Sequence, residues 1–128
     1  MIGEGPAGLV ALSAAATDKR VNTVVALNTL ATFVSDEPFT NQRLGTLAPG
    51  ILRDVGDVAH LAALCAPKHV VIAGGVSGSG KALTGEELAK AYEQTSSVFK
   101  LLGKERHLVL TTRDNVLKEL GLSPPSEK

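Results

Sequence analysis

A glycine-rich run from Gly75 to Lys81 is the first part of the sequence that could do chemistry, because it nearly matches the phosphate-binding pattern G-x-x-x-x-G-K-[ST]. In that pattern backbone N–H groups hold phosphate oxygens, the lysine reaches the outer phosphates, and the last hydroxyl binds Mg²⁺. Gly75, Gly80 and Lys81 are present, but Ala82 has no hydroxyl. A capping box at Thr84 also predicts a helix that begins too late to direct its N-terminus at a phosphate. Phosphate or nucleotide binding through Gly75–Lys81 is therefore kept as an alternative only.

The titratable side chains form no recognisable metal site or acid–base pair. The three histidines lack the H-x-x-x-H kind of spacing: His60, His69 and His107. The single cysteine, Cys65, excludes an intrachain disulfide and a cysteine zinc site, and we interpret it as a buried small hydrophobe. Asp54 and Asp57 bracket a glycine, which favours a turn or a helix cap over an acid–base pair. We expect no metal and no cofactor.

Composition excludes several classes of protein. The chain has 128 residues, of which 44% are hydrophobic, so it is long and apolar enough to form one folded domain. Only 3% are aromatic, and 13 basic residues balance 13 acidic ones, so neither a base-stacking platform nor a basic face for nucleic acid is expected. The apolar stretch Gly5–Ala16 is too short to cross a membrane and lacks the basic flank of a signal peptide. We expect a single domain over residues 1–122 and a polar tail over residues 123–128.

Strand-like and helix-like segments alternate along the chain, which predicts an α/β domain with a short parallel sheet of three to four strands between helical layers. The expected strands are residues 21–30, 69–73 and 106–111, and Met1-Ile2 is interpreted as the stub of another. The expected helices are residues 7–16, 57–66, 85–102 and a last short one that ends at Gly121. The long irregular segment 31–55 is of the kind that is functional or packs against something.

Two of the expected helices carry distinctive patterns. The helix 7–16 is apolar nearly all round, so it must be buried on most sides. The helix that follows Thr84 places one apolar stripe at helical spacing before the stop at Gly103, namely Leu88, Tyr92, Thr95, Phe99 and Leu102. We interpret this stripe as core packing.

The opening turn and two later segments together resemble one enzyme family. Gly3-Glu4-Gly5-Pro6-Ala7 stands between a strand stub and a buried helix, as the nucleophile elbow Gly-x-Ser-x-Gly does in α/β-hydrolases. The segments from Leu47 to Pro67 and from Val70 to Gly75 follow in the family's order and spacing. Over residues 2–111 the chain resembles α/β-hydrolases related to acetyl xylan esterases and dienelactone hydrolases. The resemblance implies the second half of a three-layer αβα hydrolase sheet.

The resemblance also implies a lost catalytic triad. Gly5 stands at the nucleophile position, with Gly3 and Ala7 as the flanking small residues. Ser77 falls at the position of the acid, and Thr111–Asn115, where the base is expected, contains no histidine. His107 comes too early. Without nucleophile, base and acid, the relay that activates a serine is absent.

These observations favour a non-catalytic α/β-hydrolase-like domain with a structural or interaction role, as a fragment of a larger esterase-like protein. One alternative is an active carboxylic-ester hydrolase of the acetyl esterase type that uses Ser13, Ser77 or Ser79 with His60. The other is the phosphate binder described above.

The expected partner is a protein, either a second copy of the chain or a missing hydrolase half. The apolar side chains Leu9, Val10 and Leu12 of the first helix, or the nearby sheet edge, would form the contact. Neither nucleic acid nor a membrane is expected as a partner. The sequence leaves the compartment open, and secretion or a periplasmic location would follow from a larger secreted protein.

Overall fold

The computed structural model describes residues 1–43 and 48–119. Within them the chain forms one parallel four-stranded sheet in the order β1 (Ile2–Glu4), β2 (Thr23–Leu30), β3 (His69–Val76) and β4 (Leu108–Thr111). The expected stub at the N-terminus is a true strand, because Gly3 pairs with Ala26. Three predicted features lie outside the described residues, wholly or in part: the tail 123–128, the helix end at Gly121, and residues 44–47 of the irregular segment 31–55.

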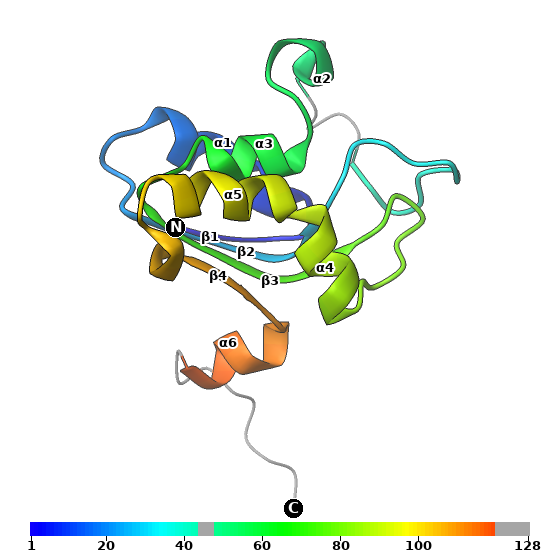
Figure 1. Ribbon diagram of the computed structural model, residues 1–128. Coiled ribbons are helices and arrows are strands. Elements are labelled where there is room, and N and C mark those ends of the chain that lie inside the picture. Colours follow the sequence, from blue (N-terminus) through cyan, green and yellow to red (C-terminus); the bar gives the residue numbers. More distant parts are fainter. Residues whose placement is uncertain (44–47, 120–128) are drawn as a thin grey trace, which may run out of the picture.

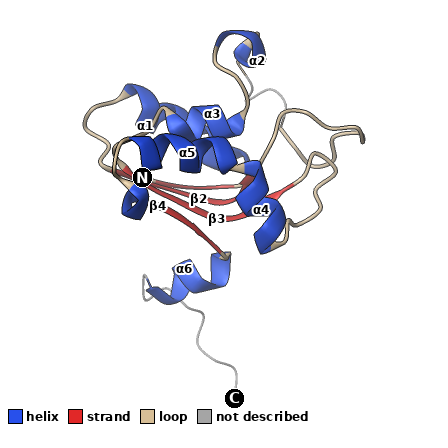
Figure 2. Ribbon diagram, in the orientation of Figure 1, coloured by secondary structure: helices blue, strands red, loops and turns tan. Residues whose placement is uncertain are grey.

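Helices cover both faces of this sheet, so the predicted three-layer α/β architecture is confirmed (Figures 1 and 2). One face carries α1 (Pro6–Thr17), α3 (Val58–Ala63), α4 (Gly85–Ala91) and α5 (Glu93–Leu101). The opposite face carries α6 (Arg113–Glu119), and the short α2 (Ile51–Asp54) projects from the helical layer. A single-turn helix, η2 (Glu105–His107), leads into β4. Among the described residues, no helix is both long and apolar enough to span a membrane.

The core is mainly aliphatic, with a few aromatic side chains, and lies between the sheet and the α1–α3–α5 layer. Its largest fully buried apolar side chains come from both layers: Leu12, Val24, Leu30, Val58, Val70, Ile72, Tyr92 and Phe99. A smaller cluster under the sheet joins Val25, Leu27 and Ala73 to Val116 of α6. Burial of each such side chain contributes about 1.5–3 kcal/mol before conformational entropy is subtracted.

Local capping signals are confirmed where they were expected. The Asp57 carboxylate accepts hydrogen bonds from the Val58 amide at 2.8 Å and from the Phe33 amide at 2.6 Å, so it caps α3 and ties down the chain beyond β2. The Thr84 hydroxyl accepts from the Glu87 amide at 3.2 Å, and the Glu87 carboxylate accepts from the Thr84 amide at 2.8 Å. That backbone donor lowers the pKa of Glu87.

The prediction of a single helix after Thr84 is wrong, because the structure has two helices there. α4 ends at Ala91 and α5 begins at Glu93, and Tyr92 between them has φ −103° and ψ 21°. Tyr92 and Phe99 are fully buried, whereas Leu102 is 52% exposed. Leu88 and Thr95 are buried too, so the stripe is core packing as predicted, except at its end, where Leu102 lies in solvent.

Two of the three α1 side chains that were expected to contact a partner are covered within the chain instead. Leu9 and Leu12 are buried against the sheet and α3, and only Val10 of the three apolar residues faces solvent, at 55% exposure. Self-association of the chain stays a prediction, and α1 offers it less apolar surface than the sequence suggested.

Close contact between α1 and the sheet depends on Gly8. A Cβ atom at this position would lie 1.8 Å from Oγ1 of Thr29, a residue of β2 that is fully buried. We predict that Gly8→Ala lowers the free energy of unfolding by about 1–3 kcal/mol, because the overpacked helix must move away from the strand.

Urea denaturation followed by circular dichroism measures this loss. Gly8→Ala/Thr29→Ala should be less destabilised than the sum of its two single variants, since the second change removes Oγ1, the atom nearest to the new methyl group. Strictly additive losses would contradict the proposed contact.

Cys65 is fully buried, and its Sγ lies 3.4 Å from the carbonyl oxygen of Leu12. Burial raises the pKa of this thiol from 9.0 to about 11. As the pH rises, the thiol therefore loses its proton in the unfolded chain before it does so in the folded chain. The free energy of unfolding is highest below pH 9 and falls between pH 9 and about 11.

We predict that this single group accounts for up to about 3 kcal/mol of the alkaline loss. Unfolding free energies of the wild type and Cys65→Ala, measured at pH 7.5, 9 and 10, test the assignment. The difference between the two proteins should shrink as the pH rises; a constant difference would refute it. Tyr92, whose pKa is raised by burial, adds the same loss to both proteins.

Candidate functional site

The carboxyl ends of the strands gather the residues that could do chemistry at one edge of the sheet. Gly5 follows β1, Asn28 lies near the end of β2, Gly74 lies near the end of β3 and Thr112 follows β4. In open parallel α/β sheets, this edge is where ligands bind. The site is therefore best described strand by strand.

The turn between β1 and α1 is sharp and held in place by the backbone. Gly5 has φ 57° and ψ −127°, its amide donates to the Leu27 carbonyl oxygen at 2.8 Å, and Pro6 opens α1. A Cβ at Gly3 would lie 2.2 Å from the Ala7 carbonyl oxygen, whereas one at Gly5 would meet nothing within 4 Å. A side chain at position 5 would thus stand free at the sheet edge, and glycine leaves that position without a functional group.

Ser77 belongs to a hairpin that closes on itself. The Ser77 amide donates to the Lys81 carbonyl oxygen at 2.9 Å, the Gly80 amide donates to the Ser77 carbonyl oxygen at 2.9 Å, and Val76 bridges to Ala82. The Ser77 hydroxyl accepts from the Lys81 amide at 3.2 Å and lies 3.0 Å from the Ser79 hydroxyl.

This hairpin differs from a phosphate-binding loop. Several amides of the run are already used within it, and α4 begins at Gly85, beyond the lysine. In this arrangement Lys81 does not stand at a helix N-terminus, so the dipole that would favour a phosphate is directed elsewhere.

Two of the three histidines lie at the amino edge of the sheet, and the third takes part in the cap of α3. His69 and His107 stack with ring centroids 4.0 Å apart at the opposite edge, where β3 and β4 begin. His60 Nδ1 accepts from the Asp57 amide at 3.1 Å as part of the α3 cap, and the Ser13 hydroxyl donates to the Leu9 carbonyl oxygen at 2.8 Å. The described residues therefore contain no serine–histidine hydrogen bond of the kind that an active hydrolase needs.

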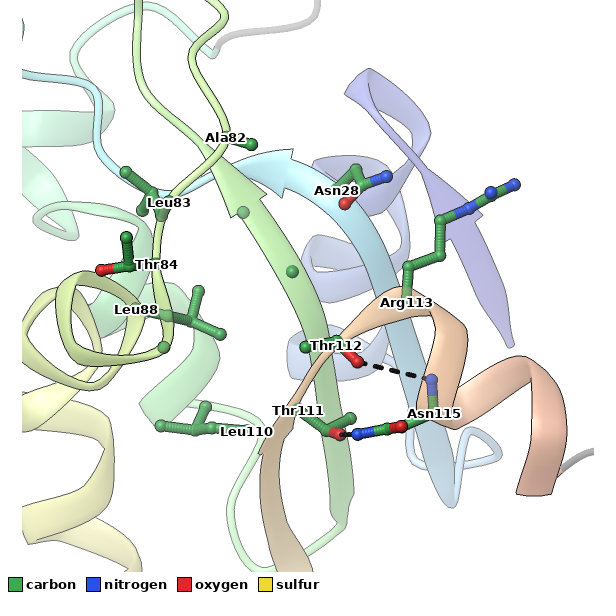
Figure 3. A pocket seen from close by; sticks show the side chains of 13 residues that line it. Asn28, Ala82, Leu83, Thr84, Leu88, Leu110, Thr111, Thr112, Arg113 and Asn115 are labelled. Atoms are coloured by element: carbon green, nitrogen blue, oxygen red, sulfur yellow. Dashed lines mark hydrogen bonds between the residues drawn. The ribbon is translucent and has the colours of Figure 1, made fainter.

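The edge nevertheless contains a groove of about 410 Å³. It exists because β4 pairs with β3 only as far as Ala73, after which the chain turns into α6, so the following backbone of Gly74 and Gly75 is left as a floor. Figure 3 shows its two sides. One is apolar and the other polar: Ala82, Leu83, Leu88 and Leu110 face Asn28, Thr111, Thr112 and Asn115.

The floor is shaped by a paired distortion of the sheet. Asn28 has φ 45° and Gly74 has φ 73°, and the two stand between the register pairs Leu27–Ala73 and Thr29–Gly75. A Cβ at Gly74 would lie 2.4 Å from Oδ1 of Asn28. The Asn28 carboxamide thus extends over Gly74, and Gly74 must lack a side chain to admit it.

One charged residue stands among the described residues that line the groove. It is Arg113, which points away from the leucines in Figure 3. Its Nε lies 3.1 Å from Oε1 of Glu4 in a half-exposed ion pair without hydrogen-bond geometry. The Glu4 carboxylate therefore compensates this charge only in part.

Sequence analysis missed this groove. The one available signal is a polar residue, Asn28, inside the apolar run of a buried strand. Asparagine is also a residue type that tolerates left-handed backbone.

Comparison of the chain with family models, curated proteins and solved structures finds no match.

The backbone at Gly5 leads to a stability prediction. Gly5→Ala has room for its methyl group but must adopt φ 57° with ψ −127°, a strained combination for an L-residue. We expect a loss of about 1–3 kcal/mol in unfolding free energy. Gly85→Ala, which also has open space around its Cβ and no left-handed φ, is the matched control and should change little or stabilise α4. Equal effects of the two variants would contradict strain at Gly5.

Proposed function

We propose that this chain is a non-catalytic α/β-hydrolase-like domain with a structural or interaction role in a larger esterase-like protein. The observation that carries the proposal is the turn at Gly5. It is a sharp strand-to-helix turn at the carboxyl edge, the place where α/β-hydrolases expose their nucleophile, and it holds a glycine. Glycine has no atom that can attack a carbonyl carbon.

The residue after the turn supports the same interpretation independently. In α/β-hydrolases the amide of the residue after the nucleophile donates one hydrogen bond to the oxyanion. Here that residue is Pro6, which has no N–H. One missing oxyanion-hole donor costs a hydrolase about 10²–10³ in rate, so the proline would impair even a restored nucleophile.

The two other triad positions support it as well. In the family the acid and then the base follow the nucleophile along the chain. The segments that leave β3 and β4 offer Ser77 and Thr112 there, and neither group orients or deprotonates a serine at neutral pH. Four separate parts of one mechanism are thus missing, which favours loss of the whole activity over the exchange of a single residue.

We predict that the purified chain hydrolyses p-nitrophenyl acetate no faster than a heat-denatured sample and that a fluorophosphonate probe does not label it. Gly5→Ser/Pro6→Ala, which supplies a nucleophile and an amide donor, should stay inactive because the acid and the base are still absent. An active serine esterase under the same conditions is the positive control.

The outcome that contradicts the proposal is specific. Turnover by the wild type that is abolished by replacing Ser13, Ser77 or Ser79 with alanine would favour the alternative, an ester hydrolase with non-standard residues. Thermal stabilisation by ATP that is lost in Lys81→Ala would favour the phosphate binder.

A further inference from the structure

We propose that the groove between the β3–α4 and β4–α6 connections binds a small neutral molecule that joins a carboxamide group to a short apolar tail. The inference goes beyond the proposed function, since it rests on the groove itself and requires no hydrolase ancestry. Its volume of about 410 Å³ lies within the range of small-molecule sites.

The polar end of the site is the Asn28 carboxamide. It is half-buried, and among the described residues its side chain has no hydrogen-bond partner. A carboxamide offers one acceptor and two donors, so it can exchange a pair of hydrogen bonds with another amide. Unused donors and acceptors in a half-buried position favour a ligand that supplies the matching groups.

The Asn28 side chain is positioned by left-handed backbone in two neighbouring strands. Two neighbouring strands adopt left-handed conformations at the same level, Asn28 and Gly74, where an undistorted parallel ladder would continue. Strained backbone of this kind occurs preferentially at functional sites. The result here is that the carboxamide lies over a glycine floor rather than beside another side chain.

The opposite side of the groove selects an apolar group. Leu83 and Leu110 are partly buried and line the groove together with buried Leu88. A methyl carbon of Leu88 stands 2.9 Å from the position of a Cβ at Gly75, so glycine at this position leaves room for the leucine over the floor. An alkyl tail that covers these leucines would remove their exposed surface from water.

The charges beside the groove favour a neutral ligand. Arg113, the charged residue of the described lining, has the Glu4 carboxylate beside it and is directed away from the leucines. A carboxylate entering the groove would lose hydration and meet the negative charge of Glu4, whereas an amide carries no charge and loses less hydration. The probe is therefore hexanamide, and sodium hexanoate and acetamide are its charged and tail-less controls.

The test is titration of the ¹⁵N-labelled chain, followed by amide chemical shifts. Hexanamide should shift the signals of Gly74, Gly75 and Thr112 in a saturable way, while hexanoate and acetamide bind about tenfold more weakly or not at all. Asn28→Gly keeps a residue that adopts left-handed backbone and removes the carboxamide, so it should weaken hexanamide binding about tenfold.

A second variant tests the proposal even if Asn28→Gly does not fold. Leu83→Ala shortens a half-buried side chain outside the helices and strands, and it should weaken hexanamide about tenfold while leaving the binding of acetamide unchanged. Undiminished hexanamide binding in both variants, shifts confined to another surface, equal binding of hexanoate, or no saturable binding at all would each overturn the proposal. None of these outcomes bears on ester hydrolysis, so failure here is distinguishable from failure of the proposed function.

Discussion

The close approach of α1 to the first two strands is the constraint on which the rest of the structure depends. Gly3 lies against the carbonyl of Ala7, and Gly8 lies against Thr29, so no side chain separates helix from sheet at these points. The chain can reach this position only through an abrupt turn, which Gly5 makes at φ 57°. The short distance between helix and strands thus determines both the small residues and the unusual backbone of the opening segment.

The position of α1 is transmitted to the rest of the helical layer. α3 packs on α1, and Cys65, just beyond α3, lies against the Leu12 carbonyl. Lys68, at the start of β3, donates from Nζ to the Asp18 carbonyl oxygen at 2.7 Å and also to that of Ala15, so it satisfies the free carbonyls at the end of α1. α5 then packs on α3, and the Thr95 hydroxyl donates to the Ala59 carbonyl oxygen at 2.6 Å. α3 is thus positioned by α1, and α5 by α3.

Features determined by neighbouring residues could be predicted from the sequence, and features determined by distant ones could not. The caps at Asp57 and Thr84 and the stop at Gly103 are local signals, and the structure confirms them. The break at Tyr92 has no local signal, since neither glycine nor proline occurs between Glu86 and Leu102. The groove depends on β4 ending before β3 does and on Asn28 lying opposite Gly74, which are properties of strand pairing.

The same distinction applies to the turn at Gly5. A residue with a side chain at position 5 would hold strained backbone, at a cost of about 1–3 kcal/mol. Glycine adopts the same angles with little strain, so it forms the turn without that cost. The shape itself is maintained by Gly3, Gly8 and Thr29, which pack α1 onto the sheet whether or not position 5 reacts. The turn in this chain is therefore a consequence of helix–sheet packing, and activity has to be argued from the groups that the turn presents.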